Sequence, residues 1–236
     1  MAAATEMIWQ DMRASVRNGD AAPRLRPLLL VRPPGIGKTY WARALAQHLM
    51  VPTSVIEATA EPASFSVTGS QRGWGSAGSG KPLESIMASG VANPVIVVDE
   101  IEKAGTVESL RGQRFDLTEG LLPFLERSTA TQWSCPYFRV SFDMSWITWV
   151  MTANSVDGLP APFLSRCPPL KLSPLSMEHL LGWADHLGAK RNLPPAAVDA
   201  VKEVIEAIKA PQLISLRSVA RMLDSVEQAI NRPPLH

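Results

Sequence analysis

This chain has few cysteines and almost no net charge. Both features limit the classes of protein to which it can belong. Only Cys135 and Cys167 occur in 236 residues, without the spacing of a metal site. A structural disulfide between them is possible but not favoured, because nothing in the sequence points to an oxidising compartment. The 23 Lys and Arg residues nearly balance the 22 Asp and Glu residues, which leaves a net charge of +1. That balance argues against a strong nonspecific hold on nucleic acid, although a local basic patch could exist.

Long hydrophobic runs are missing as well. The longest apolar stretches, around residues 28–31, 95–98 and 147–151, are far shorter than the about 20 residues that a transmembrane helix needs. The charged N-terminus also lacks the apolar segment of a signal peptide. We therefore expect a soluble cytoplasmic protein with reduced cysteines and no membrane partner. What the chain does have is a hydrophobic fraction of 46%, which suffices for a sizeable core.

A glycine-containing loop between a predicted strand and a predicted helix is the first chemical motif. The apolar segment LLLV ends at Val31, the loop RPPGIGKT follows, and YWARALAQHLM has the apolar spacing of an amphipathic helix. The loop resembles the P-loop pattern G-x-x-x-x-G-K-[ST], in which backbone N–H groups at a helix N-terminus bind phosphates. Arg32 replaces the first glycine of that pattern. The flanking strand and helix favour a P-loop over the alternative, a chance Gly/Pro turn.

The P-loop interpretation predicts ATP and Mg²⁺ as cofactors. Lys38 would neutralise the β- and γ-phosphates, and the Thr39 hydroxyl would ligate Mg²⁺. The nucleotide contacts expected in this segment are Pro34, Gly35, Ile36, Gly37, Lys38, Thr39 and Tyr40.

Two acids end a second apolar run, PVIVVDE. A continuous apolar run of this kind is typical of a buried parallel strand whose carboxyl end faces a site. Asp99 would hold a Mg²⁺-bound water, and Glu100 would orient or deprotonate the water that attacks the nucleotide. Taken alone, two acids at a strand end are more often a solvated terminus. About sixty residues after a P-loop, they are typical of a Walker B pair.

The pattern of apolar residues divides the chain into three parts. Residues 1–26 are expected to form an N-terminal helical segment, with Ile8, Trp9 and Met12 as candidate docking residues. Residues 27–173 are expected to form an α/β nucleotide-binding domain, with further strands at residues 54–58, in WITWVMTAN and at residues 170–172.

Beyond Pro174 the spacing of the apolar residues changes and predicts helices. Residues 174–236 contain three helix-like segments, at 177–187, 196–209 and 216–230, and Ser215 is a candidate N-cap for the third. The expected fold class is therefore α/β, a P-loop parallel sheet flanked by helices and followed by a small all-helical domain.

Four segments in this order, GIGKT, VVDEIEKAG, VMTANSVDGLPAPFLSRC and SLRSVARML, resemble the AAA+ ATPase superfamily. The resemblance is to the ATPase module of the Lon proteases in particular, and it covers roughly residues 28–230. In residues 121–154 the segments LLPFLE, VSFDMS and TAN look like Lon with little change in spacing, which is more specific than either Walker motif alone. The resemblance implies an AAA+ body with a helical lid domain.

The resemblance also implies roles for polar residues outside the Walker motifs. Asn154 matches the sensor-one residue that helps to position the attacking water, although an Asn there could simply cap a strand. Arg166, in PAPFLSR, matches the arginine finger that completes the site of a neighbouring subunit, the alternative being an exposed, solvated arginine. Arg217, in SLRSVARML, matches the sensor-two arginine that contacts the γ-phosphate, and Arg221 one turn further on is the alternative candidate.

The glycine-rich residues 69–82 resemble the Lon pore loop, in which an aromatic residue grips a translocating polypeptide. Trp74 occupies the matching place, five residues after Gly69, and we expect an exposed, mobile loop. The alternative is that Trp74 folds back onto the α/β body. Gly75 departs from the bulkier residue usual in Lon.

Together these matches imply an ATPase that works as a homo-oligomeric ring, most often a hexamer, and remodels or threads a protein partner as a chaperone does. The chain ends soon after the third predicted helix of the lid, so we expect no protease activity by itself. One alternative is a nucleotide-dependent switch or adaptor with little hydrolysis, which Arg32 supports. Another is a nucleic-acid motor or loader, which the near-neutral charge disfavours.

Overall fold

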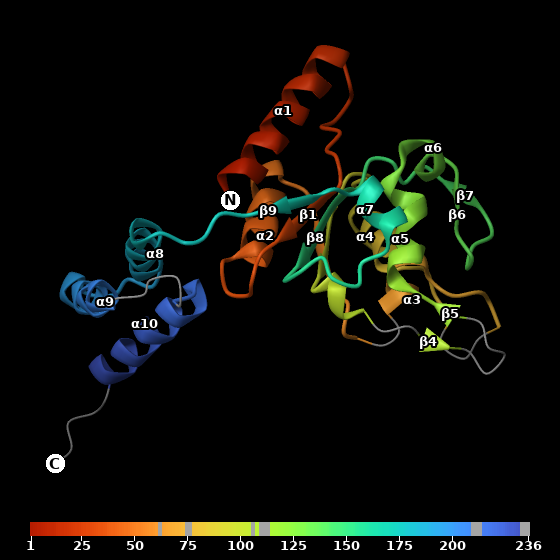
Figure 1. Cartoon of the computed structure of the whole chain (residues 1–236). Coiled ribbons are helices and arrows are strands. Elements are labelled where there is room, and N and C mark those ends of the chain that lie inside the picture. The colour runs from red at the N-terminus through yellow and green to blue at the C-terminus, as the bar shows by residue number, and fades with distance from the viewer. Residues whose placement is uncertain (61–62, 74–76, 105–106, 109–113, 209–213, 232–236) are drawn as a thin grey trace. The chain divides into compact units, whose positions relative to one another are not determined.

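The computed structural model describes residues 1–60, 63–73, 77–104, 107–108, 114–208 and 214–231. The chain forms two compact units, Met1–Arg32 with Lys38–Leu172 and Pro33–Gly37 with Ser173–His236 (Figure 1). Each unit has a hydrophobic core of its own. None of the helices in the described ranges combines the length and the apolar character that a membrane span requires.

A five-stranded sheet is the centre of the first unit. Its strand order is β2-β3-β8-β1-β9, and all its strands run parallel. Every residue of β1 and β8 is buried, as expected for strands of a parallel sheet that is covered on both faces. This architecture confirms the predicted α/β fold class. The strands are β1 (Leu28–Val31), β2 (Thr53–Glu57), β3 (Val95–Asp99), β8 (Thr148–Ala153) and β9 (Pro169–Lys171).

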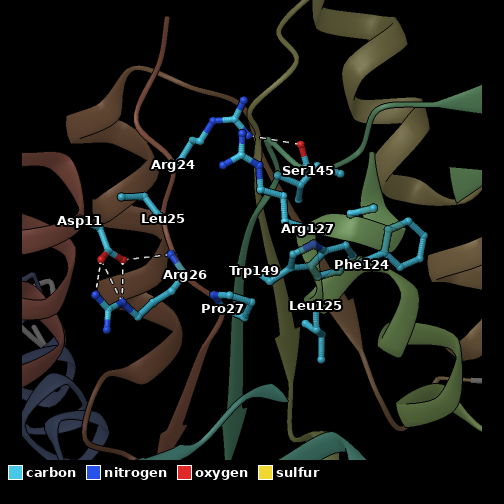
Figure 2. Close-up of a pocket in the computed structure, with 12 residues that line it drawn as sticks. Asp11, Arg24, Leu25, Arg26, Pro27, Phe124, Leu125, Arg127, Ser145 and Trp149 are labelled. Atoms are coloured by element: carbon cyan, nitrogen blue, oxygen red, sulfur yellow. Dashed lines mark hydrogen bonds and ion pairs between the residues drawn. The ribbon is translucent and has the colours of Figure 1, made fainter. Parts of the chain in front are cut away.

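Buried polar contacts attach the N-terminal helix α1 (Ala2–Asn18) to the segment that leads into β1. The buried carboxylate of Asp11 accepts hydrogen bonds from the backbone N–H and the guanidinium of Arg26 (Figure 2). The buried hydroxyl of Ser15 accepts one from the backbone N–H of Arg24 at 2.8 Å. Ile8 is buried as expected of a docking residue, whereas Trp9 is 54% exposed, so the two residues face different surroundings.

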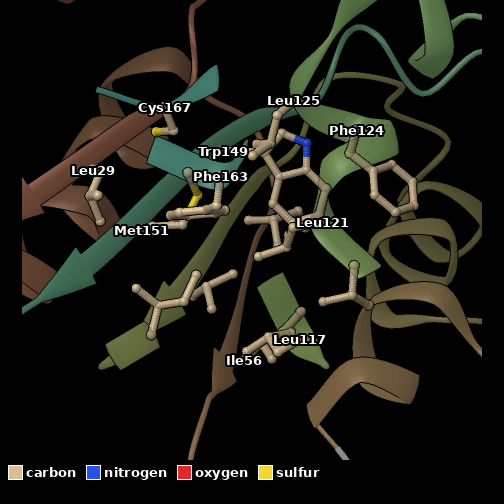
Figure 3. Packing of buried hydrophobic residues seen from close by; sticks show 14 of the residues in the cluster. Leu29, Ile56, Leu117, Leu121, Phe124, Leu125, Trp149, Met151, Phe163 and Cys167 are labelled. Carbon is tan, nitrogen blue, oxygen red and sulfur yellow. The ribbon is translucent and has the colours of Figure 1, made fainter. Parts of the chain in front are cut away.

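Helices cover both faces of the sheet. On one face, α2 (Lys38–Leu49) packs against β3 and β8 and buries Ala42 and Ala46. On the other face, side chains of α5 (Leu117–Leu125) and α7 (Ala161–Arg166) join the strand residues in one core cluster (Figure 3). The remaining elements of this unit are α3 (Ala63–Thr68), α4 (Lys81–Ser89), the 3-10 helix η1 (Ile101–Lys103), α6 (Arg127–Ala130) and the two-stranded sheets β4 (Val107–Glu108) with β5 (Arg114–Phe115) and β6 (Trp133–Ser134) with β7 (Ser141–Phe142).

Aromatic packing and two buried thiols mark this core. The ring of Phe124 lies 4.9 Å from that of Trp133 and 5.4 Å from that of Trp149, in tilted contacts that add to the area buried.

Cys135 and Cys167 are both free and buried, so the structure has no disulfide between them. Burial raises the pKa of the Cys167 thiol to about 12. Both cysteines therefore act as small apolar side chains.

The expected loop at residues 69–82 is shorter than the sequence indicates. Helix α4 begins at Lys81, and Pro82 occupies its first turn, where a missing N–H and a fixed φ are favourable. Gly80 is buried, and a Cβ at this position would lie 2.0 Å from the carbonyl oxygen of Val67. The glycine there serves close packing rather than mobility, so the expectation of an exposed loop is wrong at this end of the segment.

The second unit is a three-helix cluster, consisting of α8 (Met177–Lys190), α9 (Pro195–Ala207) and α10 (Leu216–Ile230). The Ser215 side chain caps α10 by accepting a hydrogen bond from Ser218 N, as the sequence predicts. The segment Pro33–Gly37 belongs to the same unit, where Leu216 N donates to the carbonyl oxygen of Gly35 at 2.8 Å.

Candidate functional site

Polar side chains gather in the first unit where three neighbouring strands end. Lys38 opens the helix that follows β1, Asp99 is the last residue of β3, and Asn154 follows β8. Because β3, β8 and β1 are parallel neighbours, their carboxyl ends share one edge of the sheet. Hydrogen bonds at this edge link Lys38, Thr39, Asp99, Glu100 and Asn154, five residues that the sequence selects as candidates, into a cluster with Glu102 and Thr152. We call it the Lys38 cluster.

A hydroxyl and a carboxylate form the oxygen-rich part of the Lys38 cluster. Thr39 Oγ1 lies 2.9 Å from Asp99 Oδ2 and 3.1 Å from Asp99 Oδ1. The Thr152 hydroxyl, fully buried on β8, also donates to Asp99 Oδ1. The carboxylate is thereby fixed in one orientation, with its oxygens beside the first turn of α2.

The Lys38 ammonium group is buried, with 7% of the residue exposed. It donates to the carbonyl oxygen of Arg32 and, at 3.2 Å, to Asn154 Oδ1. Burial lowers the pKa of Lys38, and the negative charges of Glu102, Asp99 and Glu100 oppose this effect. The charge of the buried ammonium group is thus balanced by protein acceptors and by nearby carboxylates.

Asn154 connects the lysine to the acids. Its Nδ2 donates to Glu102 Oε1 at 2.7 Å and lies 3.4 Å from Glu100 Oε1. These contacts, together with the one from Lys38, fix the orientation of the Asn154 amide. Its Oδ1 faces Lys38, and its Nδ2 faces the two glutamates. Glu102 was missed by the sequence analysis, and only its place two residues after the Walker B acids could have indicated it.

Glu100 adopts a strained backbone that directs its side chain into the Lys38 cluster. Its φ is 55°, a left-handed value that is uncommon outside glycine, and its backbone N–H donates to Thr152 Oγ1 at 3.1 Å. Lys103 Nζ lies 2.9 Å from Glu100 Oε1. This contact lowers the pKa of Glu100, aided by the Asn154 amide and opposed by desolvation.

Arg166, the expected arginine finger, is not among the residues that form the Lys38 cluster. Arg166 ends α7, where its Nε forms an ion pair with Glu126 Oε1 at 2.9 Å and its Nη1 donates to the carbonyl oxygen of Pro162. Arg217 and Arg221 are on α10 in the second unit. Trp74 lies outside the described residues.

The loop before Lys38 has the backbone that its sequence suggests. Gly35 and Gly37 both have a φ of 87°, which side chains rarely adopt. Arg32, which stands where a P-loop has its first glycine, directs its Nη1 to the carbonyl oxygen of Leu172 at 3.3 Å. The Arg32 guanidinium is thus bound at the end of β9. Tyr40 is 44% exposed on the first turn of α2, and Pro34 is exposed while Ile36 is half-buried.

Comparison with known proteins gives matches over most of the chain. A family model described as "ATPase family associated with various cellular activities (AAA)" matches residues 28–174. The chain is 32% identical to the Lon protease of Metamycoplasma arthritidis over 212 residues, which are 86% of this chain and 25% of that protein. It is 29% identical to Lon protease 1 of Syntrophotalea carbinolica over 188 residues, which are 76% of this chain and 22% of that protein. These matches confirm the predicted resemblance, and the chain spans about a quarter of the length of these relatives.

The contact between Lys103 and Glu100 generates a prediction about proton binding. Lys103→Met should raise the pKa of Glu100 toward its ordinary value of 4.5, because the largest cause of the lowered pKa is removed. Carbon-13 NMR of the side-chain carboxyl groups during a pH titration measures this value. A lowered pKa means that the ionised carboxylate stabilises the folded state above pH 4.5, a contribution lost as the pH falls through the folded pKa.

The matched control for this titration is Lys171→Met, which removes an exposed lysine from β9. It should leave the titration of Glu100 unchanged. A Glu100 pKa that is the same in the wild type and in Lys103→Met would contradict the assigned cause.

Proposed function

Because the chain belongs to the AAA family of ATPases, we propose that it binds ATP with Mg²⁺ at the Lys38 cluster and hydrolyses it. The observation that carries the proposal is the convergence of a buried lysine, a hydroxyl–carboxylate pair and two further acids at one edge of the sheet. In the proposal, Lys38 contacts the β- and γ-phosphates, and the backbone of residues 34–37 surrounds them.

The pair of Thr39 and Asp99 fits Mg²⁺. Mg²⁺ binds hard oxygen ligands and is commonly held by one or two protein side chains together with phosphates and water. Thr39 Oγ1 and the Asp99 carboxylate supply two such oxygens within 3.1 Å of each other. In the residues that the structure describes, no group of three or more His, Cys, Asp or Glu side chains is placed to hold a metal alone. A metal that shares its ligands with a nucleotide agrees with both observations.

The remaining acids and Asn154 are suited to handling the attacking water. Glu100 is the proposed base, because its carboxylate follows the end of β3 and lies 3.4 Å from the Asn154 amide in the Lys38 cluster. Asn154 is the proposed sensor-one residue, and its amide contacts both Glu100 and Lys38. Glu102, which accepts the shortest hydrogen bond from that amide, is a positioning residue for Asn154.

We extend the proposal to a homo-oligomeric ring that remodels or threads a protein partner. Arg166 would complete the site of a neighbouring subunit, Arg217 would report the state of the bound nucleotide, and Trp74 would contact the substrate polypeptide. A protein partner is supported by the relatives, which are named as proteases and so act on polypeptides. Arg166 is also held in place by Glu126, which favours a fixed finger over a solvated side chain.

Two substitutions test the site directly. Lys38→Ala should abolish nucleotide binding, because Lys38 is the buried cation of the Lys38 cluster. Glu100→Gln should keep nucleotide binding while removing turnover, since it keeps the side-chain shape but removes the base. Calorimetry with ATP and steady-state phosphate release measure the two effects. Lys190→Ala, an exposed lysine of α8, is the control.

Equal ATP affinity in Lys38→Ala and the wild type would contradict the site. Turnover that survives in Glu100→Gln would contradict the role of Glu100. Binding without turnover in the wild type would favour a nucleotide-dependent switch instead.

The arginine finger requires a test that separates subunits. Arg166→Ala should leave ATP binding intact but slow hydrolysis by about 10³–10⁵-fold, the usual contribution of an arginine finger. Arg13→Ala, an exposed arginine on α1, is the matched control and should not slow it. Phosphate release measures both rates.

Mixing experiments then show whether Arg166 acts in trans. Arg166→Ala and Glu100→Gln subunits each lack a different half of a shared site, so mixed rings should contain some intact sites and regain activity. Mixtures that never regain activity, combined with no dominance of either variant over the wild type, would rule out the trans role.

A further inference from the structure

A second concave site lies at the opposite edge of the same sheet. It is a pocket of about 400 Å³ within the first unit, next to Pro27, which precedes β1, and Trp149, the second residue of β8 (Figure 2). The Lys38 cluster lies beyond the other ends of these strands. Much of the wall is apolar, and these lining residues are Leu25, Pro27, Phe124, Leu125, Ala130, Ile147 and Trp149.

Positive charge dominates the polar part of the pocket. Its lining contains Arg24, Arg26 and Arg127, but Asp11 is the only acid among the lining residues. Asp11 is already engaged by Arg26 through both carboxylate oxygens. The side chains of Arg24 and Arg127 point toward the same end of the pocket (Figure 2). Arg24 forms an ion pair with Asp20, which is not a lining residue, and the charge of Asp143 also acts on it. Among the described residues, Arg127 is therefore the arginine of the lining that has no acidic partner.

The Arg24 guanidinium is held in position by three contacts. It stacks on the ring of Trp146, 3.4 Å from the ring centroid. Its Nε donates to Asp20 Oδ1 at 3.1 Å, and its Nη1 donates to Ser145 Oγ at 3.4 Å. A cation ordered in this way loses little conformational freedom when it binds an anion. Arg127 is exposed, and within the described part of the chain its side chain forms no ion pair.

The buried indole of Trp149 supplies an independent sign of a ligand. The residue is 1% exposed, and its Nε1 has no hydrogen-bond partner among the described residues. A buried donor without an acceptor costs about 1–3 kcal/mol, so native structures rarely keep one without a reason. Figure 2 shows the nitrogen on the side of the ring nearer Arg127. Because Trp149 and Arg127 both line the pocket, an anionic group bound beside Arg127 is the acceptor that we assign to this donor.

We propose that this pocket binds a small organic anion, an apolar or aromatic group that carries a carboxylate or a phosphate. The anionic group contacts the guanidinium groups of Arg24 and Arg127 and accepts a hydrogen bond from Trp149 Nε1. The apolar part lies against Phe124, Leu125 and the other apolar walls. The volume falls in the range of small-molecule sites. Because the site shares no residue with the Lys38 cluster, the proposal does not depend on ATP hydrolysis.

The test uses phenyl phosphate as the probe, with inorganic phosphate and phenol as its separate halves. The full chain, with MgADP in excess, is titrated while nitrogen-15 NMR records the indole N–H signals of its seven tryptophans. The spectrum of Trp149→Phe identifies the Trp149 signal. We expect that signal to shift saturably with phenyl phosphate, and more weakly with either half. Arg127→Ala should weaken binding about tenfold or more, as expected for the loss of a charge-assisted contact.

Arg13→Ala is the matched control and should leave the affinity unchanged. Arg127→Gln, which keeps most of the length of the side chain, should weaken binding like Arg127→Ala, and the other indole signals report whether each variant is folded. The proposal is overturned if the Trp149 signal does not shift through the millimolar range, or if Arg127→Ala and Arg13→Ala behave alike. Equal affinity for inorganic phosphate and phenyl phosphate would overturn the organic part of the assignment. Since the readout is local to Trp149, none of these outcomes depends on whether the chain hydrolyses ATP.

Discussion

The buried ammonium group of Lys38 is the charge around which one edge of the sheet is arranged. A buried cation is tolerated only when acceptors replace the water that it loses. The Arg32 carbonyl and the Asn154 amide oxygen do so directly. Three carboxylates, those of Glu102, Asp99 and Glu100, oppose the effect of burial, so the pKa of Lys38 falls less than burial alone would lower it. Those carboxylates must in turn be oriented, and Thr39, Thr152 and Asn154 do this through hydrogen bonds. The parallel register of β1, β3 and β8 makes this possible, because it brings all three strand ends to one edge.

The sequence could predict the elements whose local residue pattern agrees with their place in the folded chain. Continuous apolar runs such as LLLV and VIVV belong to strands that are covered on both faces, and the motifs at their ends therefore fall at one edge. The third lid helix and its Ser215 cap were predictable because amphipathic spacing and capping chemistry coincide there. The short helices α3 to α7 were harder, since helices of four to nine residues carry little periodicity and depend on packing. The roles of Glu102 and Trp149 were hidden for a different reason. A third acid or another core tryptophan has no local signature, and only the fold shows what lies beside it.

Strands β1 and β8 run between two chemically different regions of the first unit. At the carboxyl ends of β1 and β8, carboxylates and a single buried lysine suit a phosphate chain with its metal. At the amino ends, arginines and apolar walls suit an organic anion. Trp149 and Asn154 lie at opposite ends of the run that contains β8, with the buried Thr152 hydroxyl between them contacting Asp99. The two sites therefore lie at opposite ends of the parallel strands, with the fully buried strand β8 between them.

Thr39 and Asp99 are proposed to hold a metal that belongs to a bound nucleotide. Electron paramagnetic resonance with Mn²⁺ in place of Mg²⁺ tests it most directly, using the full chain with and without a non-hydrolysable ATP analogue. We expect Mn²⁺ to be bound only when the nucleotide analogue is present, and we expect Thr39→Val and Asp99→Asn each to reduce the bound fraction. Mn²⁺ that binds equally well without nucleotide, or binding that Asp99→Asn leaves unchanged, would contradict it.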